Sequence, residues 1–133
     1  MSRSAISTAQ TTSPVVAVGK MIPVGVTSRR YGCNLRQDGN TITMTGQGYY
    51  LIDASITVTP SVAGKVSVTA QKDGADIIGA TAAATVTDAG DLADLHIVAI
   101  ARNVCGCDTS NLSFVVGDSA VIVNNMAVTV VKL

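Results

Sequence analysis

The chain has 133 residues, the length of one domain, and is 47% hydrophobic but only 14% charged. Globular proteins usually carry about 25% charged residues, so this chain has few charges with which to cover its surface. All nine acidic residues are Asp and Glu is absent, which favours turns and argues against a helical protein. The five bases of residues 1–37 are too sparse for a nucleic-acid surface, and no apolar run reaches the ~18 residues that a membrane span needs.

Residues 1–13 (MSRSAISTAQTTS) are small and polar. They lack the apolar segment of a secretory signal peptide, and their composition is typical of a mobile terminus. We therefore predict a flexible N-terminal arm over residues 1–13 and a single domain over residues 14–133.

Beyond the arm, short runs rich in β-branched residues alternate with turn sequences. In residues 41–45, 54–59 and 65–70, apolar residues alternate with Thr, Ser or Lys, which is the pattern of a half-buried strand. We also interpret the Ala-rich residues 79–87 as a strand, because Gly, Thr and Val there disfavour a helix. Strands spaced by roughly ten residues without helical connectors predict an all-β sandwich or barrel.

Residues 92–101 differ, because apolar side chains occupy both faces of the predicted strand. Leu95 and Ile97 lie on one face, and Val98 and Ile100 lie on the other beside His96. A strand of this kind must be covered on both sides, whereas a two-sheet sandwich covers only one. A second copy of the chain is the simplest cover, so the sequence predicts a homo-oligomer. The same pattern occurs in residues 15–18, 21–26 and 121–133.

Four segments carry a resemblance to a known family: residues 46–59 (GQGYYLIDASITVT), 73–80 (DGADIIGA), 104–107 (VCGC) and 124–133 (NNMAVTVVKL). Over residues 29–133 the chain resembles the C1q/TNF-like jelly-roll domains of bacterial exosporium collagen-like glycoproteins. It also resembles small proteins encoded among the phage structural genes of Firmicutes. The exosporium proteins have a Gly-X-Y collagen stalk, which this chain lacks.

The resemblance implies a jelly-roll sandwich of about ten antiparallel strands that packs as a compact homotrimer. In such folds the inner sheet, which holds the first, last and two middle strands, forms the threefold contact. By position, the resemblance implies a trimer interface made by Tyr49, Tyr50, Ile52, His96, Val98, Ile100, Met126, Val128 and Val130.

Catalytic chemistry has little support in the sequence. There is one His, and no nucleophile-elbow, zincin or P-loop motif is present. We therefore expect neither an enzyme nor a cofactor.

Metal binding has two candidate sites that we weigh against plainer interpretations. Three copies of His96 near a threefold axis, or the thiols of Cys105 and Cys107 with Cys33 as a further ligand, could hold a metal ion. A packed histidine and small apolar thiols are the interpretations we favour, so we predict no metal. A disulfide from Cys33 to Cys105 or Cys107 is left open. Five aspartates could offer oxygen ligands to Ca²⁺, but we favour solvated turns for Asp73, Asp76, Asp88, Asp91 and Asp94.

Together these observations predict a non-enzymatic structural protein of a phage virion, as a trimeric head decoration, head fibre or tail-associated knob. We expect the arm to contact other virion proteins and the globular trimer to be exposed, where it could meet a host surface ligand. Neither nucleic acid nor membrane is expected as a partner. The alternative is a binding module on a bacterial cell or spore surface that recognises a glycan or protein ligand.

Overall fold

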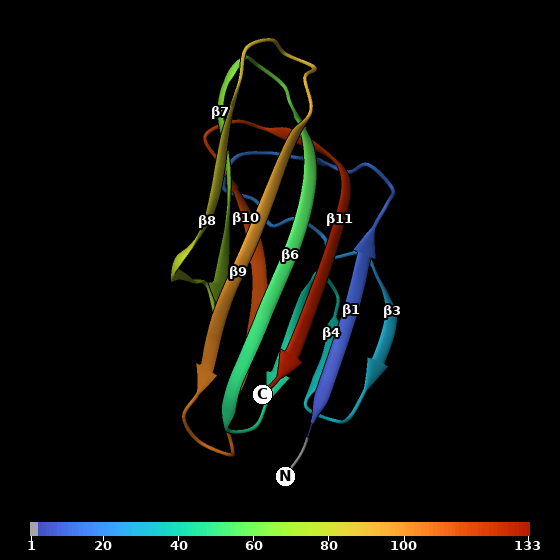
Figure 1. Cartoon of the computed structure of the whole chain (residues 1–133), viewed down its shortest axis with the longest axis vertical. Coiled ribbons are helices and arrows are strands. Elements are labelled where there is room, and N and C mark those ends of the chain that lie inside the picture. The colour runs from blue at the N-terminus through green and yellow to red at the C-terminus, as the bar shows by residue number, and fades with distance from the viewer. Residues whose placement is uncertain (1–2) are drawn as a thin grey trace.

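The computed structural model describes residues 3–133, and this part of the chain folds into two antiparallel β-sheets without a helix (Figure 1). Accordingly, these residues contain no helix able to cross a membrane. The all-β sandwich expected from the sequence is confirmed, with eleven strands in the described residues where about ten were expected. The strands are β1 (Ser4–Gln10), β2 (Val15–Val16), β3 (Val26–Tyr31), β4 (Leu35–Asp38), β5 (Thr41–Thr45), β6 (Gly48–Pro60), β7 (Gly64–Lys72), β8 (Ala75–Val86), β9 (Ala93–Asn103), β10 (Thr109–Gly117) and β11 (Val121–Lys132).

The two sheets differ in the strands they contain. Sheet A has the order β3-β1-β11-β6-β9, with β2 added beside β11, and sheet B has the order β4-β5-β10-β7-β8. Sheet A faces the viewer in Figure 1, with β9 at one edge and β3 at the other, and sheet B lies behind it. Each sheet therefore has one face on the shared core and one face directed outward.

The core is formed by alternate residues of each strand. In β6 every second residue from Tyr50 to Val58 is fully or almost fully buried, and in β10 Leu112, Phe114 and Val116 are buried opposite. Burying a large apolar side chain stabilises a fold by roughly 1.5–3 kcal/mol, so this layer is the main source of stability. The two-residue alternation of apolar residues in the sequence therefore matches the alternation of buried and outward side chains along the strands.

The N-terminal arm predicted for residues 1–13 is wrong for the described part, because residues 4–10 form β1 in the middle of sheet A. β1 pairs with β11 from Ser4 opposite Lys132 to Gln10 opposite Met126, and it pairs with β3 on its other edge. Ile6 is only 1% exposed. Residues 1 and 2 lie outside the described part of the chain.

This strand was not predicted from the sequence because residues 4–10 are mostly polar. The inward positions of β1 include Ser4 and Gln10, whose side chains are buried but hydrogen-bonded. The Ser4 hydroxyl donates to Asn34 Oδ1 at 3.0 Å, and Gln10 Nε2 donates to the Pro23 carbonyl at 3.3 Å. Buried polar groups with partners cost little, so a polar segment can occupy the centre of a sheet.

The Ala-rich segment is a strand, as predicted, and it forms the outer edge of sheet B. β8 pairs with β7, and the pairing is interrupted by a register shift between Thr69 and Gln71. Opposite this shift, Gly79 has a φ of 81°, a conformation that most other residues avoid. The neighbouring Ile78 is 99% exposed, so the irregularity turns a large apolar side chain out of the sandwich.

Candidate interaction surface

The outward face of sheet A has an apolar row that crosses the whole sheet. The strand registers align Ile100 of β9 with Leu51 of β6, Leu51 with Val131 of β11, and Val131 with Ala5 of β1. Tyr31 of β3 completes the row, opposite Ala5. We call these five residues the apolar row. Val98, which points to the same face as Ile100, is 58% exposed, and Ile100 is 54% exposed, which is unusual for large apolar residues in the body of a strand.

A second, more polar row runs beside the apolar row. It aligns Val98, Asp53, Thr129, Ser7 and Arg29 across the sheet. Several of its polar atoms have partners on the same face: Ser7 Oγ lies 3.4 Å from Thr129 Oγ1, and His96 Nε2 lies 2.6 Å from Asp53 Oδ1. The β3 side carries Arg29, while the β9 side carries charges of both signs, with Asp53 and Asp94 together with Arg102.

The predicted trimer interface divides between this face and the core. Tyr49, His96, Val98 and Ile100 are exposed on the outward face of sheet A. The other five residues are fully buried in the subunit's own core and cannot contact a neighbouring copy, so the prediction is wrong for Tyr50, Ile52, Met126, Val128 and Val130.

The error has a simple physical cause. Neighbouring strand residues point to opposite faces, so Tyr49 and Tyr50 cannot both point outward. Where both faces are apolar, composition does not reveal which is the inner one. The prediction also missed Leu51 and Val131. Leu51 points outward like Tyr49, and Val131 points outward like Thr129. Counting in steps of two from Tyr49 would have found Leu51.

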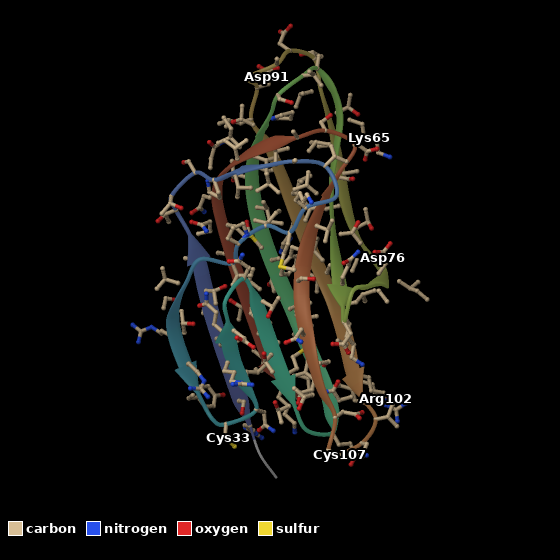
Figure 2. All side chains as sticks on the ribbon, turned by 180° about the vertical axis from the view of Figure 1, so that it is seen from behind. Cys33, Lys65, Asp76, Asp91, Arg102 and Cys107 are labelled. Atoms are coloured by element: carbon tan, nitrogen blue, oxygen red, sulfur yellow. The ribbon has the colours of Figure 1, made fainter. Side chains whose placement is uncertain are left out.

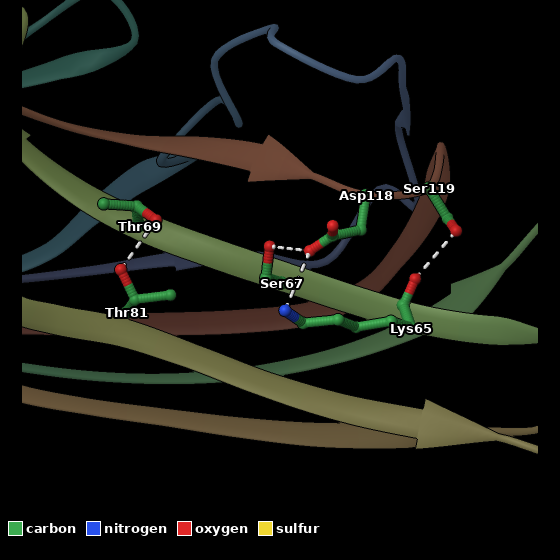
Figure 3. Close-up of polar contacts among 6 residues, drawn as sticks. All are labelled: Lys65, Ser67, Thr69, Thr81, Asp118 and Ser119. Atoms are coloured by element: carbon green, nitrogen blue, oxygen red, sulfur yellow. Dashed lines mark hydrogen bonds and ion pairs between the residues drawn. The ribbon is translucent and has the colours of Figure 1, made fainter.

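The outward face of sheet B is different, because its polar side chains bind one another. The Ser67 hydroxyl donates to Asp118 Oδ2 at 2.7 Å, and Lys65 Nζ lies 3.9 Å from the same oxygen. Figure 3 shows these contacts beside the hydroxyl pair of Thr69 and Thr81, whose oxygens are 2.9 Å apart. A face built this way is suited to contact with water.

Among the hollows that border the outward face of sheet A in residues 3–133, one lies at each side of the sheet. The larger, of about 520 Å³, lies where β8 and β9 meet and is lined in part by Asp76, Ile78, Ile100 and Arg102. Asp76 and Arg102 lie along this edge in Figure 2. The smaller, of about 210 Å³, lies between β1 and β3 at the other side of the sheet, and its lining includes Ala5, Arg29 and Tyr31.

The Cys-Gly-Cys sequence lies in the loop between β9 and β10 and brings two exposed thiols together. Cys105 Sγ and Cys107 Sγ are 2.6 Å apart, and the Cys107 N–H donates to Cys105 Sγ at 3.4 Å. Asp108 Oδ2 accepts the N–H groups of Val104 at 3.0 Å and Cys105 at 2.9 Å. The hydrogen bond between the thiols lowers the pKa of Cys105 below its ordinary value and raises the pKa of Cys107.

The candidate metal ligands are placed as follows. Within residues 3–133, one group of three metal-ligating residues has its donor atoms within 4.8 Å of one another, and it consists of Cys105, Cys107 and Asp108. Cys33 is not in this group and lies apart from Cys107 at the same end of the molecule (Figure 2). His96 is also outside the group. A hydrogen-bonded histidine at the core or the interface was expected, and His96 lies outside the core, exposed on the outward face of sheet A with Nε2 2.6 Å from Asp53 Oδ1. The aspartate-rich loops form no such group in the described residues.

Comparisons with known proteins define the fold. No protein-family model matches the chain, and no curated protein matches it by sequence. Murine APRIL at pH 5.0 has a TM-score of 0.74 at 11% identity, over 98% of this chain and 99% of that one. The globular domain of zebrafish complement 1qA protein has a TM-score of 0.69 at 8% identity, over 97% and 95%. PRD1 vertex protein P5 has a TM-score of 0.63 at 17% identity, over 98% of this chain and 73% of that one. At these identities the likeness shows the fold alone, and this chain has the TNF/C1q-like jelly-roll fold.

Proposed function

We propose that this chain is a non-enzymatic structural protein of a phage virion and that it assembles as a homotrimer through the outward face of sheet A. The observation that carries the proposal is the apolar row together with Val98 beside it, because Val98 and Ile100 are both more than half exposed. A structural role is also supported by the fold, which the chain has in common with PRD1 vertex protein P5.

The two sides of sheet A complement each other, which favours a ring. The β9 side presents Val98 and Asp53, while the β3 side presents Arg29 and the smaller hollow. Packing the β9 side of one copy on the β3 side of the next brings Asp toward Arg and apolar side chains toward an apolar hollow. Such a contact joins two different surfaces, so repeating it with a rotation of one third of a turn gives a closed trimer.

Solution mass tests the assembly. We expect a mass near three times the 13.5 kDa subunit, measured by light scattering after size exclusion. The double substitution Val98→Lys/Ile100→Lys should give monomers, because it places two ammonium groups in an apolar contact. Both positions are exposed in the subunit, so the fold should survive, which circular dichroism can confirm. Val62→Lys, at a position that is 55% exposed in the turn between β6 and β7, is the matched control and should remain trimeric. A monomeric wild-type chain at high concentration would refute the assembly.

The virion role needs a separate measurement. Particles purified from the strain that encodes the chain should contain the wild-type protein in fixed ratio to the major capsid protein, by quantitative mass spectrometry. The lysine double variant should be lost from the particles, while Val62→Lys is retained. Absence of the wild-type protein from the particles would contradict this role without affecting the trimer.

A binding module on a cell or spore surface is the second candidate, and the larger hollow favours it. The hollow is lined by charges of both signs, Asp76 and Arg102, and by the exposed Ile78 and Ile100. Pockets with a few polar groups among apolar ones are typical ligand sites. Saturable binding of a glycan or peptide that Arg102→Ala abolishes, together with absence from particles, would favour this role over the virion role.

A further inference from the structure

The Cys105–Asp108 turn holds two thiols in contact at the end of the sandwich. The Asp108 N–H donates to the Cys105 carbonyl at 3.0 Å, which closes a tight turn around Gly106. A Cβ added at Gly106 would meet nothing within 4 Å, so packing does not require glycine there.

The contact distance favours a disulfide over a bound metal. Two thiolates on one tetrahedral zinc ion, each about 2.3 Å from the metal, lie about 3.8 Å apart. The bonded sulfurs of a disulfide are about 2.05 Å apart. Cys105 Sγ and Cys107 Sγ are 2.6 Å apart, so closing a disulfide needs less movement than opening the pair around zinc.

We propose that Cys105 and Cys107 are a redox-active dithiol that reduces small-molecule disulfides of the glutathione class and closes an intrachain disulfide. The Cys105 thiolate attacks one sulfur of the disulfide, the S–S bond breaks, and one thiolate leaves. The Cys107 thiolate then attacks Cys105 Sγ in the mixed disulfide and releases the second thiolate. Two protein thiols and one disulfide thus become one protein disulfide and two small thiols, with the two electrons passing to the released thiols.

The surroundings assign the order of attack. Cys105 Sγ accepts the Cys107 N–H at 3.4 Å, a backbone contact that favours a thiolate at Cys105. Asp108 holds the Val104 and Cys105 amides in place. Both thiols are exposed, so a dissolved disulfide can reach them. Cys105 is therefore the attacking thiol and Cys107 the resolving thiol.

Oxidised glutathione tests this on the full, reduced chain. After quenching with acid, the mass of the wild type should show that the Cys105–Cys107 pair has lost two hydrogens. No glutathione should remain attached to either of these cysteines. Cys33→Ser is the matched control and should behave identically at the pair. Cys107→Ser should stop at the mixed disulfide and keep one glutathione on Cys105, as peptide mapping would show. In the wild type the pair should react about tenfold faster than the single exposed thiol of Cys33.

Three results would overturn the proposal. The pair could retain glutathione in the wild type, which would mean that the ring does not close. It could react no faster than Cys33. The purified reduced protein could carry one zinc ion per chain by elemental analysis, bound so that Cys105→Ser abolishes it and the pair resists oxidation, which would make the loop a metal site.

Discussion

The two outward faces of this sandwich share one core but differ in how their side chains are satisfied. On sheet B, Ser67, Thr69 and Lys65 find partners within the same face, as Figure 3 shows. On sheet A, the polar pairs sit beside an apolar row that has no such partners, including the exposed Ile100. The contrast shows that the residue types on the outward face of a strand indicate whether that face of the sheet contacts water or another protein surface. A hydroxyl-rich second face is suited to water, and an apolar one is suited to another protein surface.

The contrast between the two outward faces depends most on β1 being a strand of sheet A, because the apolar row crosses β1 at Ala5. Ile6→Ala should lower the free energy of unfolding by about 2–5 kcal/mol, since it removes a fully buried side chain and leaves a cavity. Urea titration followed by circular dichroism measures this change.

Val15→Ala provides the control for this test. Val15 is 77% exposed in the short strand β2, and its truncation should change the stability by less than about 0.5 kcal/mol. Equal, small effects for both variants would mean that residues 4–10 behave as the mobile arm predicted from their composition.

A smaller effect sharpens the comparison on sheet B. Ser67→Ala removes the hydroxyl bonded to Asp118 and should cost about 1 kcal/mol. Ser55→Ala, on the outward face of sheet A where Ser55 is exposed, should cost less than about 0.5 kcal/mol. Lys65→Ala should have the smallest effect, because exposed ion pairs contribute little. Thermal unfolding of the three variants at matched concentration ranks them, and a larger loss for Lys65→Ala than for Ser67→Ala would contradict this account.

Sequence periodicity predicted much of this fold. The alternation in residues 54–59 and 65–70 located parts of β6 and β7, and the apolar residues 92–101 located most of β9. These signals work because burial repeats every two residues in a strand.

Other features depend on contacts between distant residues, which periodicity does not report. β1 is held by β11 at the opposite end of the sequence, and of its three inward polar side chains Ser4 and Gln10 are satisfied by Asn34 and Pro23, whereas Thr8 Oγ1 is buried without a partner. Which alternate residues of β6 point inward depends on which face of the strand packs against sheet B. The thiol contact was visible as a Cys-x-Cys sequence, but the turn that closes it, through Asp108 and the Cys105 carbonyl, is a matter of backbone geometry.

The position of β11 between β1 and β6 has a consequence for the folding of sheet A. The hydroxyls of Ser7 and Thr129 meet across the sheet although 122 positions separate them. Until β11 docks, β1 and β6 each keep one unpaired edge, and contacts between such distant positions form slowly. Partly folded chains are open to edge-to-edge association over that interval.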